Sequence, residues 1–153
     1  DTSILSDGGG ALYLRKGTRI SGLTIRSVFF ENTATNPEVI SKLIQQIELQ
    51  QPLHDRYGVI LAGLPSASRR EGEIQLQTLL AQTGFNHPVI DYRKLTGEFA
   101  SASAVAAVIA VNFLKDRKIP GPLCGDKHGE LGAKGALILG TGDFITAVEV
   151  MPQ

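Results

Sequence analysis

A cysteine and a histidine stand close together in a glycine-rich stretch of the sequence. Cys124 and His128 lie in GPLCGDKHGE, with Asp126 between them. A cysteine nucleophile is commonly activated by a neighbouring imidazole, and a Cys and a His can also supply two of the four ligands of a metal site. The chain has 1 cysteine, and no second ligand motif lies nearby. We therefore expect neither chemistry here, no cofactor and no metal, and we expect all three histidines, including His54 and His87, to be ordinary exposed residues.

Glycine clusters suggest a second chemistry, the cradling of a phosphate by backbone N–H groups. Such a cradle follows a strand and opens a helix. The DGGGA stretch at residues 7–11 precedes an expected strand, and GTGDF at residues 140–144 separates two expected strands. Both stretches are therefore predicted to be turns.

A glutamate stands where a helix is expected to begin. Glu98 lies in YRKLTGEFASASA, with Lys94 just upstream. An acidic side chain in the first turn of a helix stabilises that helix by a few tenths to ~1 kcal/mol, because it interacts with the helix dipole. We favour this structural role, with Lys94 as an ion-pair partner of Glu98, over acid–base catalysis.

Strands and helices alternate along the chain. Apolar residues at helical spacing, with Asn36-Pro37 and Gly84 as end signals, indicate helices at residues 37–50, 71–83 and 98–116. Short apolar or β-branched runs indicate strands at residues 11–16, 21–30, 57–64, 88–92, 135–140 and 144–151. Residues 118–132 are rich in glycine and proline and are predicted to be a loop. This order predicts an α/β fold, as a single domain over residues 1–153 with a mixed, mostly parallel sheet.

Composition excludes several functional classes. Hydrophobic residues make up 42% of the 153 residues and the formal net charge is zero, so a packed core is expected and general nucleic-acid binding is not. The sequence has no apolar run long enough to span a membrane, so no membrane partner is expected. A lone cysteine fits a reducing compartment, and we expect a cytoplasmic protein.

The helix expected at residues 98–116 is apolar on all sides. Between residues 101 and 114 only Ser101, Ser103 and Asn112 are polar. A helix of this kind must be covered on more than one face. The sheet of this chain can cover one face, and the other two helices have polar faces of their own. We infer that a further layer lies over this helix, either from another part of a longer protein or from self-association.

Four stretches, in order, carry a family resemblance. They are SDGGGALYL at residues 6–14, AGLPSASRREGEIQLQTLL at residues 62–80, YRKLTGEFASASA at residues 92–104 and ALILGTGDFITAVEV at residues 136–150. Together they resemble the C-terminal half of a β-ketoacyl synthase, a 3-oxoacyl-acyl-carrier-protein synthase of the thiolase-like superfamily. The resemblance implies a half-domain of order βαβαβαββ in an αβαβα stack, whose middle layer holds a buried helix from each half. The apolar helix would be that helix.

The resemblance also implies a catalytic site from which the key residues are missing. Active members use a cysteine, which would lie in the N-terminal half, and two histidines. The first histidine should fall in residues 64–68, where this sequence has LPSAS. The second is matched by Glu98, and the family's lysine is matched by Lys94. An ionised carboxylate cannot donate a hydrogen bond to an oxyanion.

We therefore expect a degenerate ketosynthase-like domain, a fragment of a longer chain that is inert by itself. It would act like a chain-length factor in fatty-acid or polyketide synthesis. Its partners would be the N-terminal half or a ketosynthase in a homo- or heterodimer, and an acyl carrier protein is a further candidate, through Arg69 and Arg70. The first alternative is an active acyltransferase with its cysteine upstream and Glu98 or His128 recruited. The second is a stand-alone module that self-associates.

Overall fold

The protein is an α/β domain in a computed structural model that describes residues 22–36, 38–99 and 101–153. The main elements are β1 (Leu23–Asn32), α1 (Val39–Ile47), α2 (Leu53–Arg56), β2 (Tyr57–Gly63), α3 (Arg69–Thr83), β3 (Val89–Asp91), α4 (Tyr92–Thr96), α5 (Ala102–Asp116), α6 (Gly121–Cys124), β4 (Gly135–Gly140) and β5 (Phe144–Pro152). Short 3₁₀ turns occupy Thr33–Thr35 and Ser66–Ser68. The strand predicted at residues 11–16 and the matched stretch at residues 6–14 lie outside the described residues.

The strands form one mixed sheet with the order β1-β5-β4-β2-β3. β2 pairs in parallel with both β3 and β4, while β5 pairs antiparallel with β4 and β1. Among the described strands, only β5 runs against the common direction, so the predicted mixed, mostly parallel sheet is confirmed. Every residue of β2 is buried, as expected for a strand covered on both faces.

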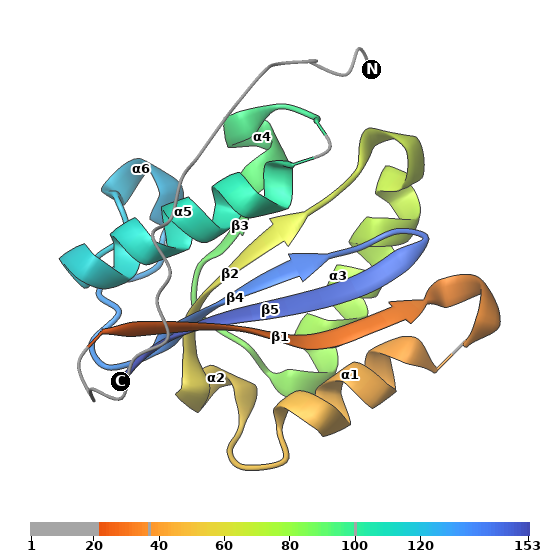
Figure 1. Cartoon of the computed structure of the whole chain (residues 1–153), viewed down its shortest axis with the longest axis horizontal. Helices are drawn as coiled ribbons and strands as arrows, with labels where there is room; N and C mark the ends of the chain where they lie inside the picture. The colour runs from red at the N-terminus through yellow and green to blue at the C-terminus, as the bar shows by residue number, and fades with distance from the viewer. Residues whose placement is uncertain (1–21, 37, 100) are drawn as a thin grey trace.

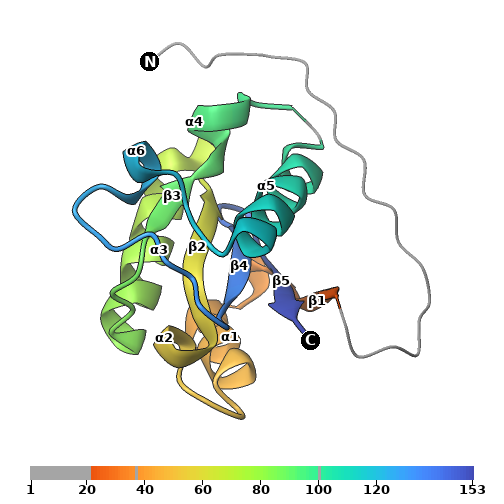
Figure 2. The same cartoon turned by 90° about the vertical axis from the view of Figure 1, so that its left-hand side faces the viewer.

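Helices cover the two faces of the sheet unequally. The long helices α1 and α3 pack on one face, and α5 packs on the other, where the short helices α4 and α6 lie beside it (Figures 1 and 2). The apolar positions of α1 explain its placement, because Val39, Ile40, Leu43 and Ile47 recur on one side and are all buried. The three layers therefore enclose two cores, one on each side of the sheet.

α5 buries one side and leaves apolar residues on the other. Its buried side chains, which face the sheet, are those of Ala102, Ala106, Ala110, Val111, Phe113 and Leu114. Ala104 is exposed, and Val105, Ala107 and Val108 are only partly buried within the described part of the chain. The helix also begins at Ala102 and not at Glu98, so the predicted start was wrong. Gly97, at φ 79°, ends α4, and the chain runs on before α5 begins.

Candidate functional site

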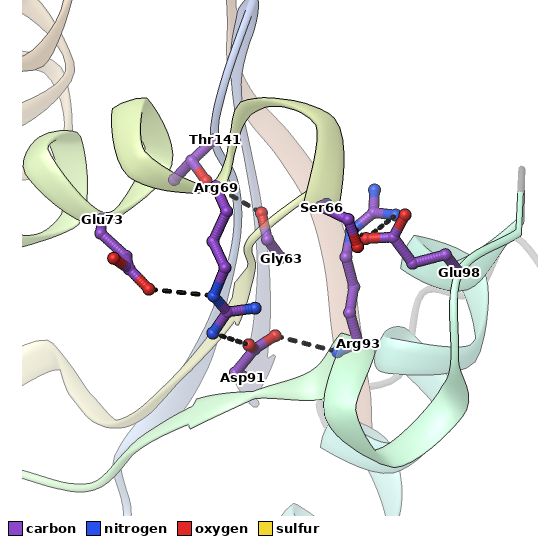
Figure 3. A network of polar contacts seen from close by, with 8 residues as sticks. All are labelled: Gly63, Ser66, Arg69, Glu73, Asp91, Arg93, Glu98 and Thr141. Carbon is purple, nitrogen blue, oxygen red and sulfur yellow. Dashed lines mark hydrogen bonds and ion pairs between the residues drawn. The ribbon is translucent and has the colours of Figure 1, made fainter. Parts of the chain in front are cut away.

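Three segments that the sequence singled out meet at one edge of the sheet. They follow the parallel strands β2, β3 and β4 and comprise residues 63–68, 91–98 and 140–143. The carboxyl ends of parallel strands are the usual place for a binding site in α/β sheets. Figure 3 shows that side chains from these segments and from the start of α3 form one polar network.

Glu98 ties the segment after β3 to the segment after β2. The backbone N–H of Ser66 donates to Glu98 Oε1 at 2.6 Å. The guanidinium of Arg93 lies 4.0 Å from the same oxygen. Glu98, which the resemblance matches to the second histidine, is therefore in contact with the segment of residues 64–68, in which the first histidine is expected.

The surroundings of Glu98 keep its carboxylate ionised. Burial acts to raise the pKa of the Glu98 carboxyl, but the hydrogen bonds from Ser66 and the charges of Arg93 and Arg69 outweigh it, so the pKa is lowered. An ionised carboxylate accepts hydrogen bonds and donates none. In this state Glu98 holds the loop at Ser66 and cannot stabilise a developing oxyanion.

Lys94 does not take part in this contact. Its side chain is exposed, and the cation beside Glu98 is Arg93. The predicted ion pair between Lys94 and Glu98 was therefore wrong, as was the placement of Glu98 in the first turn of a helix. Figure 3 shows that the side chain of Arg93 extends from α4 toward Glu98 and the loop after β2.

A second part of the network fastens α3 to the end of β3. Arg69 donates to Glu73 at 3.0 Å and to Asp91 at 3.1 Å. Asp91 also accepts from the backbone N–H of Arg93 at 3.2 Å, and so caps α4. Arg69 is thus held by contacts within the fold, whereas Arg70 is exposed.

The turn between β4 and β5 is held against α3. The buried side-chain amide of Gln75 donates to the carbonyl of Gly142 at 3.0 Å and accepts from the Gly142 N–H at 2.8 Å. Thr141 Oγ1 donates to the carbonyl of Gly63 at 2.9 Å. Gly142 has a φ of 104°, a backbone conformation that favours glycine, and a Cβ there would also lie 2.5 Å from Ser68 Oγ. The GTGDF stretch is therefore a turn, as predicted.

Sequence reasoning missed Asp91, Arg93, Gln75 and Thr141. Asp91 had a usable signal, because an aspartate directly before a short helical segment is a common N-cap. Gln75 had a weaker signal, since it lies on the side of α3 that also carries the buried Leu76 and Leu79.

The other candidate residues lie elsewhere. Cys124 is buried with its Sγ 3.5 Å from the carbonyl oxygen of Pro120, and His128 is exposed. Within the described ranges, no group of three or more His, Cys, Asp or Glu side chains is arranged to hold a metal ion. His54 and His87 are half-buried and were wrongly expected to be exposed.

An apolar groove of about 410 Å³ lies beside the network, between α5 and the sheet. Its walls come from the first turns of α5, from β4 and β5, and from the middle of β1. The lining residues include Ser103, Ala104, Ala107, Ile138, Val148 and Phe30. Phe30 is 69% exposed and stacks on Phe144 at 5.5 Å between ring centroids. The groove therefore opens on the same partly exposed apolar surface as the outer side of α5.

Comparisons with protein-family models, with curated proteins and with solved structures found no match to this chain. Among the helices of the described residues, none has the length and apolar character needed to cross a membrane.

Proposed function

We propose that this chain is a ketosynthase-like half-domain that serves a condensing enzyme as a non-catalytic partner, in the manner of a chain-length factor. The observation that carries the proposal is the contact between Glu98 and the Ser66 N–H. The contact leaves an ionised acceptor at Glu98, the position matched to the second histidine, and an occupied backbone donor within residues 64–68, where the first histidine is expected. Oxyanion stabilisation needs free donors at this point.

Two features of the fold support the same proposal. The described elements follow the order β-α-β-α-β-α-β-β once the short helical turns are set aside, which is the unit that the resemblance implies. The outer side of α5 and the groove beside it form an apolar surface at the place where the other half would pack. The proposed partners are therefore the N-terminal half of the same fold or an active ketosynthase, in a homo- or heterodimer.

The two alternatives differ in how well the structure supports them. Recruitment of Glu98 as a base is disfavoured because a lowered pKa makes the carboxylate a weak base. His128 is exposed, and no contact in the described residues links it to Glu98. Self-association through α5 is favoured by the same apolar surface and remains the second candidate. Arg70, exposed at the start of α3, is the more accessible of the two arginines for a carrier protein.

The first experiment measures the mass of the chain by sedimentation across a dilution series and, in the same samples, CO2 release from a malonyl thioester. We expect a dimer or larger species that persists on dilution, and no CO2 release above a protein-free control. Val108→Glu, on the outer side of α5, should dissociate the species. Gln77→Glu, the same charge change on the exposed side of α3, should not.

Each other outcome has a defined meaning. CO2 release that is abolished by Glu98→Gln would overturn the non-catalytic role in favour of an active enzyme. A monomer that unfolds cooperatively would show that the chain covers α5 by itself, and the half-domain proposal would lose its physical support.

A further inference from the structure

A cluster of basic side chains lies at the opposite edge of the sheet, where the chain enters the parallel strands. His54 belongs to α2 just before β2, His87 lies just before β3, and Lys134 immediately precedes β4. These entry segments lie together near α2 in Figure 1. The cluster uses no residue of the candidate functional site.

Three heavy atoms form a closed triangle in this cluster. Lys134 Nζ lies 2.8 Å from the carbonyl oxygen of His54 and 2.8 Å from His87 Nε2. His87 Nε2 itself lies 3.0 Å from the same carbonyl oxygen. An ammonium group only donates hydrogen bonds, so Lys134 can donate to both neighbours only when Nε2 is an acceptor and the neutral imidazole carries its proton on Nδ1. In this tautomer Nε2 and the His54 carbonyl are two acceptors that share one ammonium group.

Protonation of His87 would reverse this arrangement. With a proton on Nε2, the imidazolium would donate to the His54 carbonyl. Lys134 would then lose one of its two acceptors, share the other with the imidazolium and face a like charge. We propose that His87 and Lys134 form a proton-operated clasp, closed when His87 is neutral and opened by acid, that joins the segments entering β2, β3 and β4.

The charges around His87 all oppose its protonation. Burial lowers the pKa of the His87 imidazole from its usual 6.5, and the charges of Lys134, His54 and Lys127 lower it further, against a smaller contribution from the His54 carbonyl. Lys127 reaches this edge because it donates to the carbonyl of Asn86 at 2.6 Å. The acidic side chain of Asp55 lies 3.6 Å from His54 Nε2.

The direction of the pH effect follows from this lowered pKa. Above about pH 6.5 His87 is mostly neutral in both folded and unfolded chains, so the clasp makes its full contribution to the stability of the fold. As the pH falls through 6.5 toward the pKa of the folded protein, the unfolded chain binds the proton more readily and stability is lost. The unfolding equilibrium constant should rise tenfold for each unit by which the pKa is lowered.

The test is urea unfolding of the full chain at pH 7 and pH 5, with wild type, His87→Gln and His128→Gln. Gln can accept a hydrogen bond from Lys134 at both pH values, so His87→Gln should lose most of the difference in unfolding free energy between pH 7 and pH 5. His128→Gln, at an exposed histidine, should keep this difference. If this difference in unfolding free energy were equal in His87→Gln and wild type, the proposed clasp would be wrong. NMR titration of wild type is independent of the variants: the clasp requires an Nδ1–H tautomer and a His87 pKa below 6.5, and it fails if either is absent.

Discussion

Two glutamates at opposite edges of the sheet show how differently the same side chain can be used. Glu149 accepts from Arg26 Nε at 2.7 Å, from Arg56 Nη2 at 2.7 Å and from the Tyr57 hydroxyl at 2.8 Å. Its side chain is only 4% exposed, whereas that of Glu98 is 23% exposed. Glu98 accepts a hydrogen bond from the backbone N–H of Ser66, and the guanidinium of Arg93 lies 4.0 Å away.

Burial decides what each site can tolerate. Around Glu149, burial and the hydrogen bond to the carboxylate raise the pKa of the Tyr57 hydroxyl, so Tyr57 remains a donor. Removing the carboxylate there would leave charged and polar groups without partners and away from water, which is costly. Around Glu98 water can replace a lost partner. The position of Glu98, the more exposed of the two glutamates, is therefore the one at which a substitution should leave the fold intact.

The largest effect should come from Glu149→Gln. The neutral amide cannot balance Arg56, whose side chain is 10% exposed, so we expect a loss of roughly 3–5 kcal/mol in the free energy of unfolding. Urea denaturation measures the loss. Arg26→Gln, at a side chain that is 60% exposed, should cost under about 1 kcal/mol. If the two variants were equally stable, burial would not be what separates the two glutamates.

A smaller loss should follow Gln75→Ala at the other edge. The change leaves the N–H and carbonyl of the buried Gly142 without their partner, at a cost of about 1–3 kcal/mol in unfolding free energy. Gln77→Ala, on the exposed side of the same helix, is the matched control and should stay within about 0.5 kcal/mol of wild type. If Gln75→Ala left the free energy of unfolding unchanged, the turn between β4 and β5 would not depend on its contact with α3.

Glu98→His should be tolerated, with an unfolding free energy within about 1 kcal/mol of wild type, because the lost acceptor of the Ser66 N–H lies at an exposed residue that water can reach. Thermal unfolding followed by circular dichroism is sufficient to measure this. Collapse of the fold would show instead that Glu98 is as structural as Glu149, and the proposal of a substituted catalytic position would fail.

The smallest effect is the titration of Glu98 itself. Its pKa is lowered from 4.5, so its contribution to stability is complete above about pH 4.5 and is lost as the pH falls through the folded value. The carboxyl ¹³C shift in NMR should report this midpoint below 4.5, and Glu98→Gln should remove the signal. A midpoint at or above 4.5 would mean that the Ser66 hydrogen bond is weak in solution.

The sequence predicted elements better than contacts. β4 was placed at its observed bounds because an apolar run lies between two glycines, and this is a local signal. The start of α5 was placed too early because residues 98–101, which follow Gly97, were read as the first turn of the helix. Local patterns cannot show that the chain turns there.

The partners of the site residues depend on strand order, which no local pattern contains. Glu98 meets Ser66 because β3 lies beside β2, and the sequence offers both Arg93 and Lys94 as candidate cations. Likewise, the contacts of His87 with Lys134 and with the carbonyl of His54 join residues that are distant in the sequence.

The position of β1 has a consequence for how the protein folds during synthesis. Among the described strands its partner is β5, the last to be made, so Leu23 pairs with Pro152. Contacts between such distant residues slow folding, because a long loop must close before the contact forms. Until then β1 carries Phe29 and Phe30 unpaired, and unpaired apolar strands attract other chains. While this protein is being synthesised, β1 therefore stays without its partner until β5 has been made.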